Sequence, residues 1–206
     1  MHAAVRGVFA MTILTLLGSS ALAQPAKIDP DWPCQQIKTP TFSLATVWAG
    51  PTLDLDSQAW RNESEVSDLE AKMVQRRVPI ADVDSAIKDF KAKAVPDANA
   101  KLLRAFAAAF EDLTQQRSQV IDGLDRFGRK QNALANRIRK ENETVQNSSE
   151  QKSDSPTPPG VSDQDKLLWD IRVYNDRRQT ASYVCEVPTL IEQRIGEIAR
   201  AVQSAL

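Results

Sequence analysis

The chain is short of histidine, methionine and glycine, and each shortage excludes a kind of chemistry. Its 206 residues include one histidine, His2, which lies in a segment that we expect to be removed on export. The remaining chain then has no imidazole, which excludes Ser-His-Asp and Cys-His catalysis and histidine-based metal sites. The few scattered glycines build no phosphate-binding loop. We therefore expect no cofactor and no metal.

Net charge is also lacking. The 26 lysines and arginines nearly balance 27 aspartates and glutamates, so no overall field attracts nucleic acid or an anionic membrane. Basic residues do gather at Arg126, Arg129 and Lys130 and again at Arg137, Arg139 and Lys140. Aromatic residues are not interleaved with them, as single-stranded nucleic acid would require, so we expect no nucleic-acid partner. They indicate the solvated side of a long helix or, alternatively, a partner surface.

The N-terminus has the pattern of a secretory signal peptide over residues 1–23. Arg6 precedes a short apolar run from Val8 to Leu17, and the segment ends in Ala21-Leu22-Ala23. The run is too short for a bilayer span, which needs about 20 apolar residues. We predict cleavage after Ala23 and a periplasmic or secreted product without a membrane span; a retained anchor is the alternative.

The predicted export affects how the two cysteines, Cys34 and Cys185, are interpreted. An oxidising compartment favours a disulfide, and two cysteines allow one intramolecular pairing. The alternative, a reactive or metal-binding thiol pair, usually has closer spacing. We predict a Cys34–Cys185 bridge that ties the N-terminal arm to the C-terminal part of the chain.

Residues 24–62 are predicted to form an irregular arm. Five prolines prevent a long helix, whereas Trp32, Trp48 and Trp60 indicate that the arm packs onto the rest of the protein. One or two helical turns are expected between Ser43 and Pro51. The arm's aromatic residues either line a ligand pocket or, as we favour, cap the core.

The rest, residues 63–206, is predicted to be a helical domain. Apolar residues recur every three or four positions over 64–77 and 81–93, which indicates two short amphipathic helices separated near Pro79. A much longer heptad seam extends from 99 to 146, interrupted by polar residues at Arg117, Gln131 and Glu141. Gly123 and Gly128 lower helix propensity near its middle.

A second long helical pattern follows a loop predicted over residues 146–160, which is polar and ends in prolines and a glycine. The pattern begins after Ser162 and continues to Val202, and Pro188 is expected to kink or divide it. One loop joining two long helices predicts an antiparallel hairpin. The predicted fold is therefore all-α: a long helical hairpin, two short helices and a disulfide-tied arm.

With these absences, the sequence favours a non-catalytic exported interaction protein that acts as a scaffold, adaptor or accessory subunit. The short helices and the arm cover only part of the hairpin, so the rest is expected to bind a protein partner or to self-associate. The candidate partner-binding residues are Leu124, Phe127, Leu134 and Ile138, faced by Leu167, Leu168, Ile171 and Tyr174.

The sequence agrees less well with two other functions. A holdase-like periplasmic chaperone would need an adaptable, usually Met-rich surface, and only Met73 remains after signal removal. A carboxylate-only hydrolase would use residues such as Glu63, Glu65, Asp68 and Glu70, which equally suit the solvated face of a helix. Asp54 to Glu65 resembles a calcium loop but has Ala59 where glycine is required.

Overall fold

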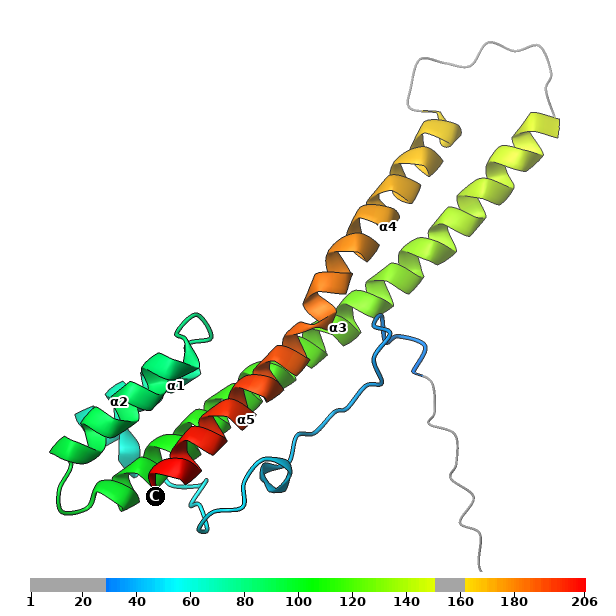
Figure 1. Ribbon diagram of the computed structural model, residues 1–206. Helices are drawn as coiled ribbons and strands as arrows, with labels where there is room; N and C mark the ends of the chain where they lie inside the picture. The colour runs from blue at the N-terminus through cyan, green and yellow to red at the C-terminus, as the bar shows by residue number, and fades with distance from the viewer. Residues whose placement is uncertain (1–28, 151–161) are drawn as a thin grey trace, which may run out of the picture.

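The computed structural model describes residues 29–150 and 162–206, and this part of the chain is mostly helical (Figure 1). Two 3-10 helices come first, η1 (Leu44–Thr46) and η2 (Ala59–Asn62). They are followed by α1 (Ser64–Val74), α2 (Ile80–Lys93), α3 (Ala98–Glu150), α4 (Asp163–Cys185) and α5 (Val187–Ala205). The described residues contain no strand, which confirms the all-α prediction. The signal peptide predicted over 1–23 lies outside them.

Helix α1 ends earlier than the sequence pattern predicted, at Val74 rather than Arg77. A buried arginine of α5 provides hydrogen-bond donors for the backbone carbonyl groups at this end. The guanidinium of Arg194 donates to the carbonyl oxygens of Met73 at 3.0 Å and Gln75 at 3.1 Å. The last carbonyls of a helix have no partner within it, so Arg194 supplies one from another element.

Helix α3 continues to Glu150, so its described end overlaps the loop predicted to start at Gln146. The predicted start of that loop was wrong. None of residues 146–150 is proline or glycine, and polar residues alone do not stop a helix. The hydroxyl of Ser148 donates to the carbonyl oxygen of Thr144, one turn earlier. The remainder of the predicted loop, residues 151–160, lies outside the described part of the chain.

The break between α4 and α5 falls where Pro188 predicted it. Helix α4 ends at Cys185, and Pro188 is the second residue of α5. Proline is tolerated there because the first backbone N–H groups of a helix have no acceptor within it.

Helices α4 and α5 run back along α3 in the opposite direction (Figure 1). Polar contacts made by the polar residues of the heptad seam agree with this antiparallel arrangement. Glu141 of α3 pairs with Lys166 at the start of α4 at 3.2 Å. Nearer the start of α3, Arg117 pairs with Glu192 of α5 at 2.6 Å and also donates to the carbonyl oxygen of Thr39 in the arm. The polar interruptions of the seam therefore act as links between elements.

The apolar core lies at one end of the molecule. It gathers buried residues of α1, α2, α5 and the first part of α3, including Val66, Met73, Ile87, Leu102, Phe106, Phe110, Leu113, Ile195 and Val202. Two aromatic residues of the arm lie against it: the rings of Trp48 and Phe106 are 4.6 Å apart, and those of Phe42 and Phe110 are 6.4 Å apart. The core cluster contains no residue of α4.

Candidate interaction surface

A disulfide joins the arm to the last residue of α4. Cys34 and Cys185 are bonded with their Cα atoms 5.6 Å apart, across a sequence separation of 151 residues. The predicted pairing is confirmed. The bridge fixes the arm beside the middle of α3, where α4 ends and α5 begins.

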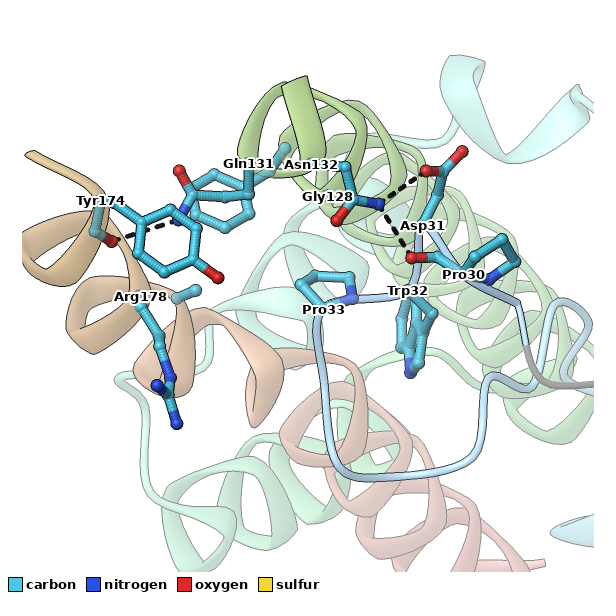
Figure 2. A pocket seen from close by; sticks show the side chains of 11 residues that line it. Pro30, Asp31, Trp32, Pro33, Gly128, Gln131, Asn132, Tyr174 and Arg178 are labelled. Atoms are coloured by element: carbon cyan, nitrogen blue, oxygen red, sulfur yellow. Dashed lines mark hydrogen bonds between the residues drawn. The ribbon is translucent and has the colours of Figure 1, made fainter. Parts of the chain in front are cut away.

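Just before this bridge, the arm crosses α3 at very short range (Figure 2). The side-chain amide of Asn132 donates to the carbonyl oxygen of Pro30 at 2.9 Å and to a carboxylate oxygen of Asp31 at 3.0 Å. Gly128 lies one turn before Asn132, and a Cβ atom on it would lie 1.7 Å from the carbonyl oxygen of Asp31. Glycine at residue 128 is therefore needed for this crossing.

An ion-pair cluster holds the arm a few residues further along. The Lys38 ammonium lies 2.8 Å from a carboxylate oxygen of Asp125 on α3 and 2.8 Å from one of Asp29 in the arm. Hydrogen bonds to Asp125 and then Asp29 raise the pKa of Lys38, and the bond from Lys38 lowers the pKa of Asp29. These charges attach the arm to one side of α3.

A small cavity of about 160 Å³ lies where the arm meets α3 and α4. Trp32 and Pro33 of the arm, Gln131 of α3 and Tyr174 and Arg178 of α4 are among its lining residues (Figure 2). The amide of Gln131 donates to the backbone carbonyl oxygen of Tyr174 at 3.2 Å. This cavity is part of the joint between the arm and the two helices.

A larger groove of about 340 Å³ opens between α3 and α4. Its lining contains no charged residue and consists of Val120, Gly123, Leu124, Phe127, Thr180, Ala181 and Val184. Gly123, Ala181 and Thr180 are small, so their side chains leave space between the two helices. Phe127 and Ala181 line both this groove and the cavity beside the arm.

The structure separates the predicted partner-binding residues into three groups. Leu124, Leu134 and Leu167 are buried. Phe127, Ile138 and Tyr174 are half-buried, and Leu124 and Phe127 meet in the groove. Leu168 and Ile171 are 57% and 36% exposed, and so present apolar surface to solvent.

The sequence pattern did not identify several residues of this surface. Trp169 is 63% exposed on α4, and Val184 is 40% exposed at the groove. Gly123 and Thr180 also line the groove. Apolar residues occur around much of α4, so their spacing did not show which of them face α3. No sequence pattern indicates where small residues will leave a groove between two helices.

Two of the four carboxylates considered for catalysis form ion pairs. Glu63 pairs with Arg104 at 2.9 Å, and Glu65 pairs with Lys101. Glu70 is buried, and this burial, followed by the charge of Asp112, raises its pKa, although Arg61 acts in the opposite direction.

Within the described residues, no group of three or more His, Cys, Asp or Glu side chains is placed to hold a metal ion. None of the helices in residues 29–150 and 162–206 combines the length and apolar character that crossing a bilayer requires. Comparisons of the chain with protein-family models, with curated proteins and with solved structures found no match.

Proposed function

We propose that this chain is a non-catalytic exported protein that acts as a scaffold, adaptor or accessory subunit in the periplasm or outside the cell. In this proposal α3 and α4 form a heptad-type helical hairpin, and the part of it far from the core binds a protein partner or a second copy. The exposure of Leu168 and Trp169, 57% and 63%, is the observation that carries the proposal.

Two large apolar side chains in sequence leave α4 with an uncovered apolar surface. Burying such a side chain stabilises a complex by about 1.5–3 kcal/mol, so the pair favours contact with another surface. Ile171 lies one turn further along α4 and is also partly exposed, at 36%. The core cluster contains no α4 residue, and at this end of α4 Leu167 is buried whereas Leu168 and Trp169 remain exposed.

The holdase-like chaperone has weaker support. Such chaperones usually present flexible methionine side chains to their clients. Met73, the one methionine beyond the predicted signal peptide, is fully buried in the core.

Photo-crosslinking in the organism that encodes the chain tests the proposal. We would place benzoylphenylalanine separately at residues 168 and 169, with residue 88 of α2 as the matched exposed control. The expected result is a discrete crosslinked product from 168 and 169 in the exported fraction, and none from 88. A broad smear of products would instead support a holdase. An absence of crosslinks at all three positions, or retention of the protein in the cytoplasm, would contradict the proposal.

A further inference from the structure

The two sides of the α3–α4 pair differ in what covers them. The arm packs on one side, where it crosses Gly128. The groove that Gly123 lines opens elsewhere on α3, because five residues of an α-helix turn through about 140°. Within the described part of the chain, the arm fills the first side and nothing fills the groove.

The groove continues along α4 as a largely apolar stripe, which is interrupted by the exposed Asp176 four residues before Thr180. Trp169, Val173, Thr180 and Val184 are separated by four, seven and four residues, which places them on one face of the helix. Trp169 and Val184, at the two ends of this stripe, are both exposed. The stripe is about 22 Å long at 1.5 Å per residue, which matches about four turns of a docked helix.

Positive charge borders the groove. The guanidinium of Arg126 reaches to 3.9 Å from the position that a Cβ atom on Gly123 would occupy. Lys130 lies one turn beyond Arg126 on α3, and Arg177 lies one turn before Thr180 on α4. All three cations are exposed, and none of them forms an ion pair or a hydrogen bond with a described residue.

This charge is not balanced along α3. From Val120, where the groove begins, to residue 148, the helix carries six basic residues (Arg126, Arg129, Lys130, Arg137, Arg139, Lys140) and four acidic ones (Asp122, Asp125, Glu141, Glu143). A second copy docked groove to groove would bring like charges together, because a twofold contact uses the same surface twice. A partner with negative charge suits the surface better.

We propose that the groove between α3 and α4 binds one amphipathic helix of another protein, whose apolar face fills the groove and whose flanks carry aspartate or glutamate. Such a helix would complete a three-helix arrangement opposite the arm. Its acidic flanks would pair with Arg126, Lys130 and Arg177. The inference rests on the proposed function, because it names the kind of partner and the place where that partner binds.

Synthetic helices provide the probe. One 18-residue capped peptide has leucine at helical spacing and glutamate at the flanking positions, and its control has lysine in place of every glutamate. Fluorescence anisotropy with the purified disulfide-bonded protein measures the two affinities. We expect the glutamate peptide to bind at least about tenfold more tightly at low salt, and this advantage to shrink at high salt, where charges are screened.

Variants locate the binding. Gly123→Leu places a side chain in the groove, and the open space beside Gly123 lets the variant fold, which circular dichroism verifies. It should weaken binding of the glutamate peptide at least about tenfold. Arg126→Glu with Lys130→Glu should reverse the preference between the peptides. Arg139→Glu with Lys140→Glu has the same change in charge away from the groove and should leave the glutamate peptide preferred.

Three results would overturn the inference: equal affinity for the two peptides, binding unchanged by Gly123→Leu, or a dimer in sedimentation that Gly123→Leu dissociates. The last result would assign the groove to a second copy. Crosslinks from residue 169 that persist in the Gly123→Leu variant would leave the proposed function standing while removing the groove from it. Peptide binding that follows the expected pattern, without any crosslink in the cell, would contradict the proposed function alone.

Discussion

Gly128 of α3 lies directly beneath the backbone carbonyl of Asp31, so closely that a Cβ atom would lie 1.7 Å from the carbonyl oxygen. Gly123, five residues earlier on the same helix, has open space where its Cβ would be, with Arg126 as the nearest group at 3.9 Å. Both glycines weaken the helix by about 1 kcal/mol relative to alanine. Only one of them is required by a neighbour.

The first prediction is that Gly128→Ala destabilises the protein by about 1–2 kcal/mol, despite the better helix propensity of alanine. The added methyl group must push the arm away from α3, which disrupts the bonds from Asn132 to Pro30 and Asp31. Urea denaturation followed by circular dichroism measures the change.

Gly123→Ala is the matched control for this prediction. It should stabilise the protein by about 0.5–1 kcal/mol, because alanine fits the space and favours the helix. If Gly128→Ala stabilised the protein as Gly123→Ala is expected to do, the close crossing of the arm over Gly128 would be contradicted.

The second prediction concerns the disulfide. Replacing Cys34 by serine should cost about 3–5 kcal/mol, because the bridge closes a loop of about 150 residues and restricts the unfolded chain. The double variant with Cys185→Ser should lose the same amount as the single one, since either change removes the one bond. In the unmodified protein, thiol titration in denaturant should find no free thiol. Two reactive thiols per exported chain would refute the bridge.

The third prediction is that Glu70→Gln increases the stability of the folded protein, by an amount that depends on pH. Burial raises the pKa of Glu70 above its ordinary value of 4.5, so protonation favours the folded state. The stability contributed by the protonated Glu70 is fully present below the pKa that Glu70 has in the unfolded chain. It is lost as the pH rises through the pKa that Glu70 has in the folded protein. Glutamine, which stays neutral, should avoid this loss.

The stability difference between the Glu70→Gln variant and the original protein should therefore be small near pH 4 and favour the variant at neutral pH. Denaturant titrations over this range measure it. Glu111→Gln, at an exposed position of α3, is the control. A variant that is less stable than the original protein at neutral pH would show that the Glu70 carboxylate has a favourable partner.

Local patterns in the sequence were enough to predict much of the fold. Apolar spacing located α1, α2 and α3, Pro188 located the division between α4 and α5, and the cysteine count with the export signal gave the disulfide. Each of these features depends on nearby residues or on a single possible pairing. The predicted end of α3 failed because polar residues such as Gln146 permit a helix as well as a loop.

Contacts between distant segments were not predictable in this way. Arg194 satisfies carbonyl groups at the end of α1, more than a hundred residues earlier, and nothing near α1 indicates that partner. Gly123 and Gly128 look alike as weak points of one helix, yet one opens a groove and the other admits the arm. Leu167 and Leu168 are neighbours with opposite exposure, which depends on the direction in which α4 faces α3.

The last prediction is that the half of the α3–α4 pair far from the core opens more readily than the half beside the disulfide. Apolar packing in the core cluster draws on the first part of α3, whereas the far half has only a few buried apolar residues, such as Leu134 and Leu167, and polar links such as Arg137–Asp170 and Lys166–Glu141. The cationic side chains of these links are 56% and 60% exposed, and exposed ion pairs contribute only about 0–1 kcal/mol each.

Substitutions in the two halves should therefore differ. Phe106→Ala removes a fully buried ring and should cost about 3–5 kcal/mol. Phe127→Ala removes a half-buried ring that borders the groove, and Leu134→Ala removes a side chain that lies outside the core cluster. Both substitutions should reduce stability less than Phe106→Ala does. Both should also weaken partner binding or self-association. Hydrogen exchange on the isolated protein should find lower protection beyond Leu134 than around Phe106. Uniform strong protection along both helices in a proven monomer would mean that the far half needs no partner, and the proposed interaction surface would lose its main physical support.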